Sequence, residues 1–217
     1  MSLLNIIAKG GWLMIPILLF SIAAVVLIVN KYIDLDRFKT KSNHIMYELK
    51  ALIASGKKDE AINLCKGSKG AVPLVLKEGL LNAHHDKDGI ESYMEAVGTE
   101  QVHLMEKNMS LLATIAGVAP LTGFLGTVTG MMSAFMEIER LEGNVNATVL
   151  AGGIWEALMT TATGLGVGIV AFIYYNYFTA KIHHIAFDIE SNSTELVDII
   201  LETRQKENPQ QGLQNEN

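Results

Sequence analysis

The chain has 217 residues, of which 49% are hydrophobic and 18% are charged, and its mean hydropathy is +0.27. This composition argues against an ordinary soluble domain, because the apolar residues come in long blocks. The net charge of −6 is spread along the chain without a basic stripe, so nucleic-acid binding has little support. The single cysteine, Cys65, excludes an internal disulfide and a cysteine-rich metal cluster. We expect it to be a small buried residue of a helical hairpin.

The first apolar block lies between Lys9 and Lys31 and contains 21 residues without a formal charge. A helix needs about 20 apolar residues to cross the hydrocarbon core of a bilayer. We therefore predict a transmembrane helix over 10–30, after a short N-terminus at 1–9. A cleaved signal peptide is the alternative. The block is longer than the apolar core of a signal peptide and no small-x-small site precedes the polar flank, which favours an uncleaved span.

Residues 31–107 are too polar and too long to be a simple connection, and they predict a helical domain. Two apolar helix faces are separated by a turn from Gly67 to Pro73. The first face consists of Ala61, Leu64 and Cys65, and the second of Val75, Leu76 and Leu80. A further stripe runs without a breaker into the second apolar block and consists of Ile90, Met94, Val97, Val102, Met105 and Met109. Residues 88–136 therefore predict one uninterrupted rod of roughly 70 Å.

The second and third apolar blocks are rich in small residues. We predict transmembrane helices over 108–136 and 152–180, joined by a short connection at 137–151. In the second helix Gly123, Gly126 and Gly130 recur at steps of three and four residues, and in the third Gly164 and Gly168 form a G-x-x-x-G pattern. Small residues let helix backbones approach closely in a membrane, so these glycines predict tight packing within or between subunits.

The C-terminal segment repeats the helical pattern. Its apolar stripe consists of Ile182, Ile185, Ile189, Leu196 and Ile200. This spacing predicts a helix over 181–206 that continues the third span. The remaining residues, 207–217, are rich in Gln and Asn and are expected to be disordered.

The basic residues predict the orientation of the spans. Four of them follow the first span, at Lys31, Arg37, Lys39 and Lys41, against a single Lys9 before it. The connection between the second and third spans holds only Arg140 with three glutamates. Because basic flanks stay in the cytoplasm, the N-terminus and the 137–151 connection are expected outside, and the 31–107 domain and the C-terminus inside.

Polar residues inside the second and third spans are candidates for an ion path. Threonines occur at positions 122, 127, 129, 160, 161 and 163, although each hydroxyl could simply bond to a carbonyl of its own helix. An ionisable group at membrane depth, such as Glu156, indicates an ion or substrate path unless it lies near enough to the surface to stay hydrated. Thr160 and Thr163 lie within about 40° of Glu156 around the helix and Thr161 about 140° away. The third span thus carries polar residues on two different faces. This suits a helix that lines a pore with one face and contacts a neighbouring helix with the other.

The segments "IAGVAPLTGFLGTVTGMMSAF" and "LAGGIWEALMTTATGLGVGIVAFIYYNYF" resemble the MotA/TolQ/ExbB proton channel family, most closely its ExbB and TolQ branch. The resemblance implies an all-α membrane protein whose second and third transmembrane helices extend into a cytoplasmic helical bundle. It also implies a pentamer around a dimer of a single-span ExbD/TolR-like partner that carries the protonatable aspartate. A TonB/TolA-like protein is a further expected partner.

The same resemblance implies roles for individual residues. Thr127 and Thr161 correspond to pore-lining threonines and Glu156 to the family's glutamate, while Pro120 and Gly126 shape the second span and Asn176 marks the inner end of the third. Two positions depart from the pattern, because Val170 and Gly152 stand where the family often has prolines. The third span is therefore expected to be straighter, and its outer start less sharply defined.

These observations predict an inner-membrane proton channel subunit that couples the proton motive force to work at the outer membrane or envelope. Glu156, Thr127, Thr161 and Thr160 are the expected ion-path residues, with Glu156 tuning or relaying rather than carrying most of the protons. A non-conducting scaffold that assembles a partner complex is the alternative. An enzyme, a cofactor and a metal site are not expected. The adjacent histidine pairs at 84–85 and 183–184 lack the i, i+4 spacing of metal ligands, and sodium remains open as the transported ion.

Overall fold

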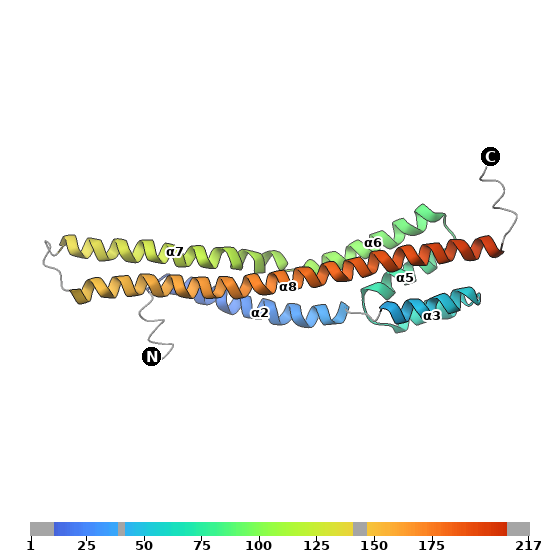
Figure 1. The fold of residues 1–217 in the computed structure, drawn as a ribbon, viewed down its shortest axis with the longest axis horizontal. Coiled ribbons are helices and arrows are strands. Elements are labelled where there is room, and N and C mark those ends of the chain that lie inside the picture. The colour runs from blue at the N-terminus through green and yellow to red at the C-terminus, as the bar shows by residue number, and fades with distance from the viewer. Residues whose placement is uncertain (1–10, 39–41, 141–146, 208–217) are drawn as a thin grey trace. The chain divides into compact units, whose positions relative to one another are not determined.

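The computed structural model describes residues 11–38, 42–140 and 147–207. Within these ranges the regular secondary structure is helical throughout (Figure 1). The helices are α2 (Met14–Phe38), α3 (Ser42–Ala54), α4 (Lys58–Gly67), α5 (Ala71–Leu81), α6 (Lys87–Glu106), α7 (Met109–Arg140) and α8 (Ala147–Glu207). The predicted N-terminus at 1–9, residues 141–146 of the predicted outer connection and residues 208–217 of the predicted tail lie outside the described residues.

The chain divides into two compact units. One comprises Met1–Lys31 and Asn108–Phe178, and we call it the apolar unit. The other, which we call the polar unit, comprises Tyr32–Lys107 and Thr179–Asn217. Helix α8 contributes to both units, because it runs from Ala147 to Glu207 without interruption. The expected helical continuation of the third span past Lys181 is therefore confirmed.

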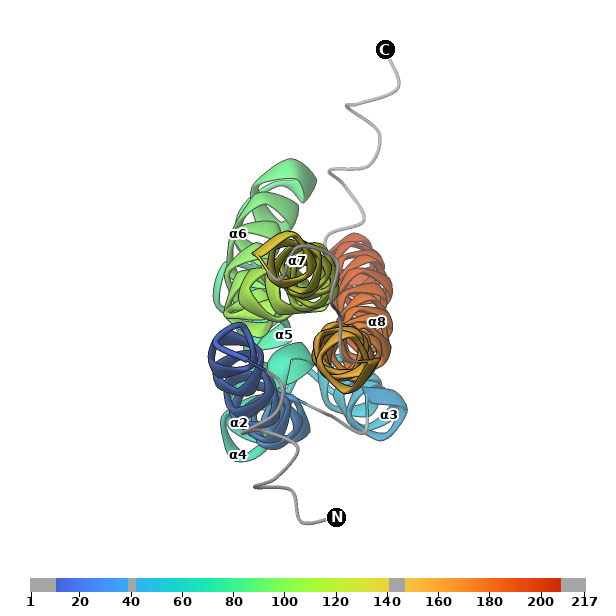
Figure 2. The same ribbon diagram turned by 90° about the vertical axis from the view of Figure 1, so that its left-hand side faces the viewer.

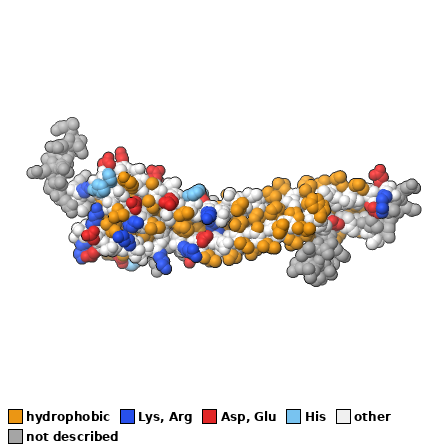
Figure 3. Space-filling view, turned by 180° about the vertical axis from the view of Figure 1, so that it is seen from behind, with side chains coloured by type: hydrophobic (Ala, Val, Ile, Leu, Met, Phe, Trp, Pro, Cys, Tyr) orange, Lys and Arg blue, Asp and Glu red, His pale blue; other side chains and the backbone are white. Residues whose placement is uncertain are grey.

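The apolar unit is built from α2, α7 and the first part of α8, which lie at the corners of a triangle when viewed along their length (Figure 2). Among the described residues, three helices are long and apolar enough to cross a membrane, as predicted. Hydrophobic side chains cover the face of this unit shown in Figure 3. In this unit, the side chains of Leu121, Phe124 and Ile169 are more than half exposed. Such a surface suits contact with lipid or with other apolar helices.

In the polar unit, α3, α5 and α6 contact the second part of α8, and α4 packs against α3 and α5. Helix α3 ends at Ala54, and Gly56 follows it with a φ of 72°, which only glycine adopts readily. The amides of Gly56 and Lys57 donate to the carbonyls of Ile53 and Leu52, both at 3.0 Å, which satisfies the end of the helix. Helix α6 begins at a side-chain cap, because Asp86 accepts a hydrogen bond from the Gly89 amide at 3.2 Å.

The predicted helical hairpin and the predicted C-terminal stripe are both present. Helices α4 and α5 are separated by a turn at 68–70, and Ala61 and Cys65 are buried on α4. On α5 the three predicted residues Val75, Leu76 and Leu80 are buried as well. All five residues of the C-terminal stripe are also buried. Leu64, the third residue predicted for the face of α4, is only half-buried, and Pro73, which was predicted to belong to the turn, lies within α5. For the other residues, helical periodicity identified the inner faces correctly.

The prediction of one uninterrupted rod over 88–136 is wrong. Helix α6 ends at Glu106 and α7 begins at Met109. Between them, Lys107 has the extended ψ of 132° and Asn108 the left-handed φ of 65°. Asparagine is among the few residues other than glycine that tolerate this conformation, so it allows the break where most side chains would oppose it. The Leu112 amide donates to the Asn108 carbonyl at 3.3 Å, and α7 starts from there.

Candidate functional site

Glycines bring the backbones of α7 and α8 into direct contact in the apolar unit. A Cβ atom added to Gly164 would lie 2.6 Å from the Ala119 carbonyl oxygen and 3.0 Å from the Cα atom of Gly123. A Cβ atom added to Gly123 would lie 2.9 Å from the Thr160 carbonyl oxygen. These distances leave no room for a side chain at either position. The two helices therefore depend on glycine here for their close approach.

The other predicted packing residues belong to the same contact. A side chain at Gly126 would collide with that of Thr160, and a Cβ atom at Gly130 would lie 2.9 Å from the Cβ atom of Ala157. Gly168 faces the ring of Pro120 in the same way. Since Pro120 has no amide proton, it cannot bond to the carbonyl of Ala116, and that oxygen lies 3.1 Å from a Cβ built on Gly168. The proline ring on α7 thus fills the space that the glycine on α8 leaves.

Of the six threonines that the sequence analysis singled out in these two helices, five bond to their own helix. The hydroxyls of Thr122, Thr127, Thr129, Thr160 and Thr163 donate to carbonyls three or four residues earlier, at 2.6 to 3.0 Å. Thr161 differs, because its hydroxyl donates to the Gly123 carbonyl on α7 at 2.7 Å. It thereby joins α8 to α7 at the point where their backbones are closest. This geometry is consistent with the prediction that the third span carries polar residues on two faces. Thr161 lies on the face that contacts α7.

A small chamber lies beside this contact and is partly lined by its residues. Its volume is about 110 Å³. It is lined by Trp12 and Leu13 at the start of α2, by Gly126, Thr129, Gly130 and Ser133 on α7, and by Gly153, Glu156 and Thr160 on α8. The glycines leave the space, and the hydroxyls and the carboxylate make it polar. The chamber therefore has both apolar and polar walls.

Glu156 is the charged group of this chamber. It is half-buried and lies roughly 14 Å along α8 from the first residue of the helix, at 1.5 Å per residue. A side chain at Gly11, which has a φ of 65°, would collide with the Glu156 carboxylate, so the turn before α2 lies directly against this group. None of the ion pairs formed among the described residues includes Glu156. A carboxylate in an apolar environment is stabilised by water, by hydrogen-bond donors or by a cation.

The remaining predicted residues lie elsewhere. Thr127 and Thr161 are half-buried and do not line the chamber, so within one chain they are not brought together with Glu156. Asn176 is exposed and donates to the Phe172 carbonyl of its own helix at 2.9 Å. Val170 is 47% exposed, and α8 continues through it and begins five residues before Gly152. The two missing family prolines therefore coincide with an uninterrupted helix.

Trp12 and Ser133 carry polar atoms and line the chamber, but the sequence did not single them out as site residues. Ser133 follows Gly126, Thr129 and Gly130 at helical spacing, which forms a stripe of small and hydroxylated residues on one face of α7. This stripe could have identified Ser133 from the sequence. Trp12 carries no comparable pattern, because its position depends on how the start of α2 folds against α8.

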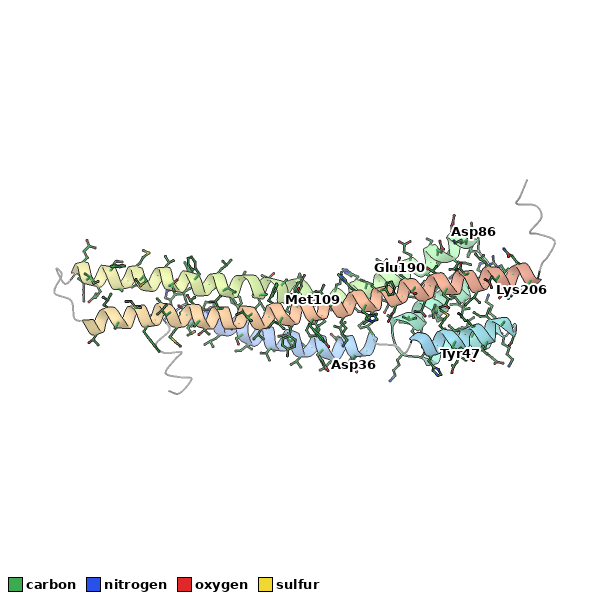
Figure 4. All side chains as sticks on the ribbon, in the orientation of Figure 1. Asp36, Tyr47, Asp86, Met109, Glu190 and Lys206 are labelled. Atoms are coloured by element: carbon green, nitrogen blue, oxygen red, sulfur yellow. The ribbon has the colours of Figure 1, made fainter. Side chains whose placement is uncertain are left out.

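A second cavity, of about 520 Å³, lies in the polar unit between α6 and α8. Its floor includes the buried Met94, Ile189 and Val197. Three exposed carboxylates, those of Glu91, Glu95 and Glu190, stand on its rim, and Figure 4 labels Glu190. This groove holds none of the residues predicted for an ion path.

Comparison with known proteins relates this chain to one family of membrane proteins. The sequence profile described as the MotA/TolQ/ExbB proton channel family matches residues 68–191, more than half of the chain. This range includes α7, the described part of α8 up to residue 191, and the contact between them.

Individual relatives carry related names. The chain is 32% identical to an ExbB-like biopolymer transport protein (ExbB-like 1) of Synechocystis sp. over 181 residues, which cover 80% of this chain and 69% of that protein. It is 29% identical to the biopolymer transport protein ExbB of Salmonella typhimurium over 184 residues, covering 78% and 72% of the two chains. Over 94 residues it is 36% identical to the Tol-Pal system protein TolQ of Pseudomonas aeruginosa, covering 43% and 40%.

Proposed function

Because this chain belongs to the MotA/TolQ/ExbB proton channel family, we propose that it is an ion-conducting subunit of an energy-transducing complex in the bacterial inner membrane. The observation that carries the proposal is Glu156, a carboxylate in the apolar unit that faces a polar chamber and has no ion-pair partner among the described residues. A helix that only anchors the chain in lipid gains nothing from such a group.

The proposed assembly is a pentamer that encloses a dimer of a single-span ExbD/TolR-like partner. Support comes from the relatives' names, which refer to biopolymer transport and to the Tol-Pal system. The partner would supply the main protonatable group, and a TonB/TolA-like protein would receive the work. The apolar side chains that remain exposed on α7 and α8 offer surface for neighbouring subunits as well as for lipid.

The proposed orientation places the N-terminus and the 137–151 connection outside and the polar unit in the cytoplasm. It rests on the basic residues from Lys31 to Lys41 after the first span. In this orientation Glu156 and the chamber belong to the outer half of the membrane. Asn176 belongs to the inner end.

We assign separate roles to the polar residues of α8. Glu156 relays or tunes the ion from the chamber, and Thr160 presents its oxygen to the same space. Thr161 holds α7 and α8 together through the Gly123 carbonyl, which sets the surface that the two helices present to a pore. Thr127, one turn beyond Gly123 on α7, belongs to that pore surface.

The test is proton flux into proteoliposomes that contain the full chain with and without its single-span partner. We expect flux only with the partner. A positioned proton-transfer group contributes a hundredfold or more, so Glu156→Gln should lower the flux at least about tenfold. Thr161→Val should also lower it, because the hydrogen bond between the helices is lost. Thr163→Val is the matched control, because the Thr163 hydroxyl bonds only to the Met159 carbonyl of its own helix.

Two results would reject the proposal. The first is wild-type flux in both Glu156→Gln and Thr161→Val, which would remove these residues from the ion path. The second is a partner that copurifies with the chain in a complex that conducts nothing. That outcome would identify a non-conducting scaffold instead.

A further inference from the structure

The groove between α6 and α8 in the polar unit is built from one face of each helix. Its lining residues on α6 follow Glu91 at positions i+3, i+4, i+7, i+8 and i+11, and those on α8 follow Ala186 at the same positions. This spacing keeps to one side of a helix. At 1.5 Å per residue it extends over roughly 16 Å, or about three turns. The groove therefore has the length and the helical walls against which a further helix can pack.

The floor of the groove is apolar. Met94, Ile189 and Val197 form part of it, and each of them is buried. Gly98 lies halfway along α6's side of the groove, and a Cβ atom added there would lie 3.2 Å from the Cγ2 atom of Ile189. Glycine thus lets the two helices approach closely under the groove. The volume of about 520 Å³ above this floor is sufficient for several apolar side chains of a ligand.

Carboxylates make the rim of the groove acidic. Glu91, Glu95 and Glu190 are exposed there, and Figure 4 labels Glu190. Glu91 pairs with Lys87 of its own helix at 3.7 Å. Glu95 and Glu190 take part in none of the ion pairs found in the part of the chain that the structure describes. Both α6 and α8 therefore contribute uncompensated negative charge to the rim.

The charge of the rim determines which kind of segment fits the groove. The last ten residues of this chain contain Glu216 and neither lysine nor arginine, so their charge has the same sign as that of the rim. Two copies of the chain that met through this groove would also bring carboxylates together, which is unfavourable. A basic segment is attracted instead. Helical grooves of this kind bind amphipathic helices through apolar side chains at i, i+3 or i+4, and i+7.

We propose that the groove between α6 and α8 is a docking site for a basic amphipathic helix of a partner protein. An apolar stripe of that helix enters the groove over Met94, Ile189 and Val197, and lysine or arginine side chains beside the stripe pair with Glu95 and Glu190. The site belongs to the polar unit and does not depend on ion flux. Only the compartment of the partner, the cytoplasm, rests on the proposed orientation.

The probe is a fluorescently labelled synthetic peptide of about 18 residues, which is long enough to form a helix in isolation. It carries leucines at i, i+4, i+7 and i+11 and lysines on both sides of this stripe. A second peptide has glutamates in place of the lysines, and a third has the composition of the first in scrambled order. Fluorescence anisotropy measures binding to the purified full-length protein, and empty micelles of the same detergent provide the background. We expect saturable binding of the first peptide only, and weaker binding at high salt.

Matched variants remove the same charge at two different places. Glu95→Gln combined with Glu190→Gln should raise the Kd of the basic peptide at least about threefold, because two ion pairs at the rim are lost. Glu100→Gln combined with Glu202→Gln changes two exposed carboxylates of the same helices that do not line the groove, and it should leave the Kd unchanged. Thr99→Trp fills the groove from an exposed position and should abolish saturable binding, whereas Glu100→Trp should not.

The proposal is overturned if the basic peptide binds no more tightly than the acidic one, or if Glu95→Gln with Glu190→Gln leaves its Kd unchanged. It is also overturned if Thr99→Cys, in a Cys65→Ala background with an unchanged thermal midpoint, does not react with a maleimide. A second copy of the chain would then cover the groove. These outcomes are independent of the flux assay. A chain that conducts ions but does not bind the peptide rejects the docking site alone, and a chain that binds the peptide without conducting rejects the channel alone.

Discussion

Gly164 and Gly166 lie two positions apart on α8 and have opposite surroundings. A Cβ atom on Gly164 would meet backbone atoms of Ala119 and Gly123, whereas one on Gly166 would meet no atom within 4 Å. Backbone atoms cannot move aside as a flexible side chain can. The two glycines therefore have the same helix propensity and different structural roles.

This contrast gives a paired prediction. Gly164→Ala should lower the stability of the protein by about 1–3 kcal/mol, the usual effect of overpacking, because α7 and α8 are pushed apart. Gly166→Ala should leave it unchanged or raise it by up to about 1 kcal/mol, since alanine is the better helix former. The measurement is the thermal midpoint of each variant in the same detergent. Equal midpoints for the two variants would mean that α7 and α8 do not touch as described.

The thiol of Cys65 is a second residue whose chemistry depends on its surroundings. Burial raises its pKa from 9.0 to about 11, although the nearby Lys77 lowers it. Because the folded pKa lies above the unfolded one, burial stabilises the protonated thiol. This contribution to the free energy of unfolding is complete below pH 9 and is lost as the pH rises through 11.

The reaction of Cys65 with Ellman's reagent should therefore follow the raised pKa. At pH 8 the thiolate fraction is about a hundredfold lower in the folded chain than in the unfolded chain, so the folded protein should react that much more slowly. The rate should also keep rising beyond pH 9. A rate that levels off near pH 9 in the folded protein would show that the thiol is not buried. Cys65→Ala serves as the blank.

At the scale of elements, the interruption between α6 and α7 depends on one residue that adopts a left-handed conformation. Asn108 has a φ of 65° and an exposed side chain. The backbone conformation, rather than side-chain packing, therefore determines which residues are tolerated at this position. The break separates a helix of the polar unit from a helix of the apolar unit.

Replacement of Asn108 by a β-branched residue and by glycine should have opposite effects. Asn108→Val should lower the free energy of unfolding by about 1–2 kcal/mol, the cost of the left-handed conformation for an L-residue. Asn108→Gly should be neutral or slightly stabilising, because glycine adopts this conformation freely. Thermal midpoints again provide the measurement. If valine were tolerated as well as glycine, α6 and α7 would be joined as one continuous helix after all.

At the scale of the whole molecule, the apolar unit leaves large hydrophobic side chains exposed on all three of its helices, for example Ile22, Phe135 and Phe172. Lipid alone would satisfy such a surface. The proposed function requires that part of it is covered by further copies of the chain, so that the α7–α8 surfaces enclose a pore.

The full chain, purified alone in mild detergent, should therefore be an oligomer. Native mass spectrometry should give a protein mass that is a multiple of 23.7 kDa, and five copies are expected. A chain that remains a 23.7 kDa monomer in several detergents, with its thermal midpoint intact, would contradict the proposed assembly.

Much of the fold could be predicted because its signals are local. Uncharged blocks identify three membrane-spanning helices, and the spacing of Ile182, Ile185 and Ile189 identifies the buried face of α8. Glu156 stood out for the same reason, since a carboxylate among apolar residues is visible without any structure. The interruption at Asn108 could not be predicted, because asparagine is also compatible with a helix and only the packing on either side decides the outcome.

Apart from the interruption at Asn108, local patterns in the sequence identify the helical segments, those that suit a membrane and the polar side chains they carry. Tertiary structure alone decided what those side chains face. Periodicity defines the face of a helix on which a residue lies, but not the partner that covers this face. The bond from Thr161 to the Gly123 carbonyl joins residues 38 positions apart, and the wall of the chamber comes from Gly11 and Trp12 at the far end of the chain. Such contacts depend on the rotation and register of packed helices, which no local pattern encodes.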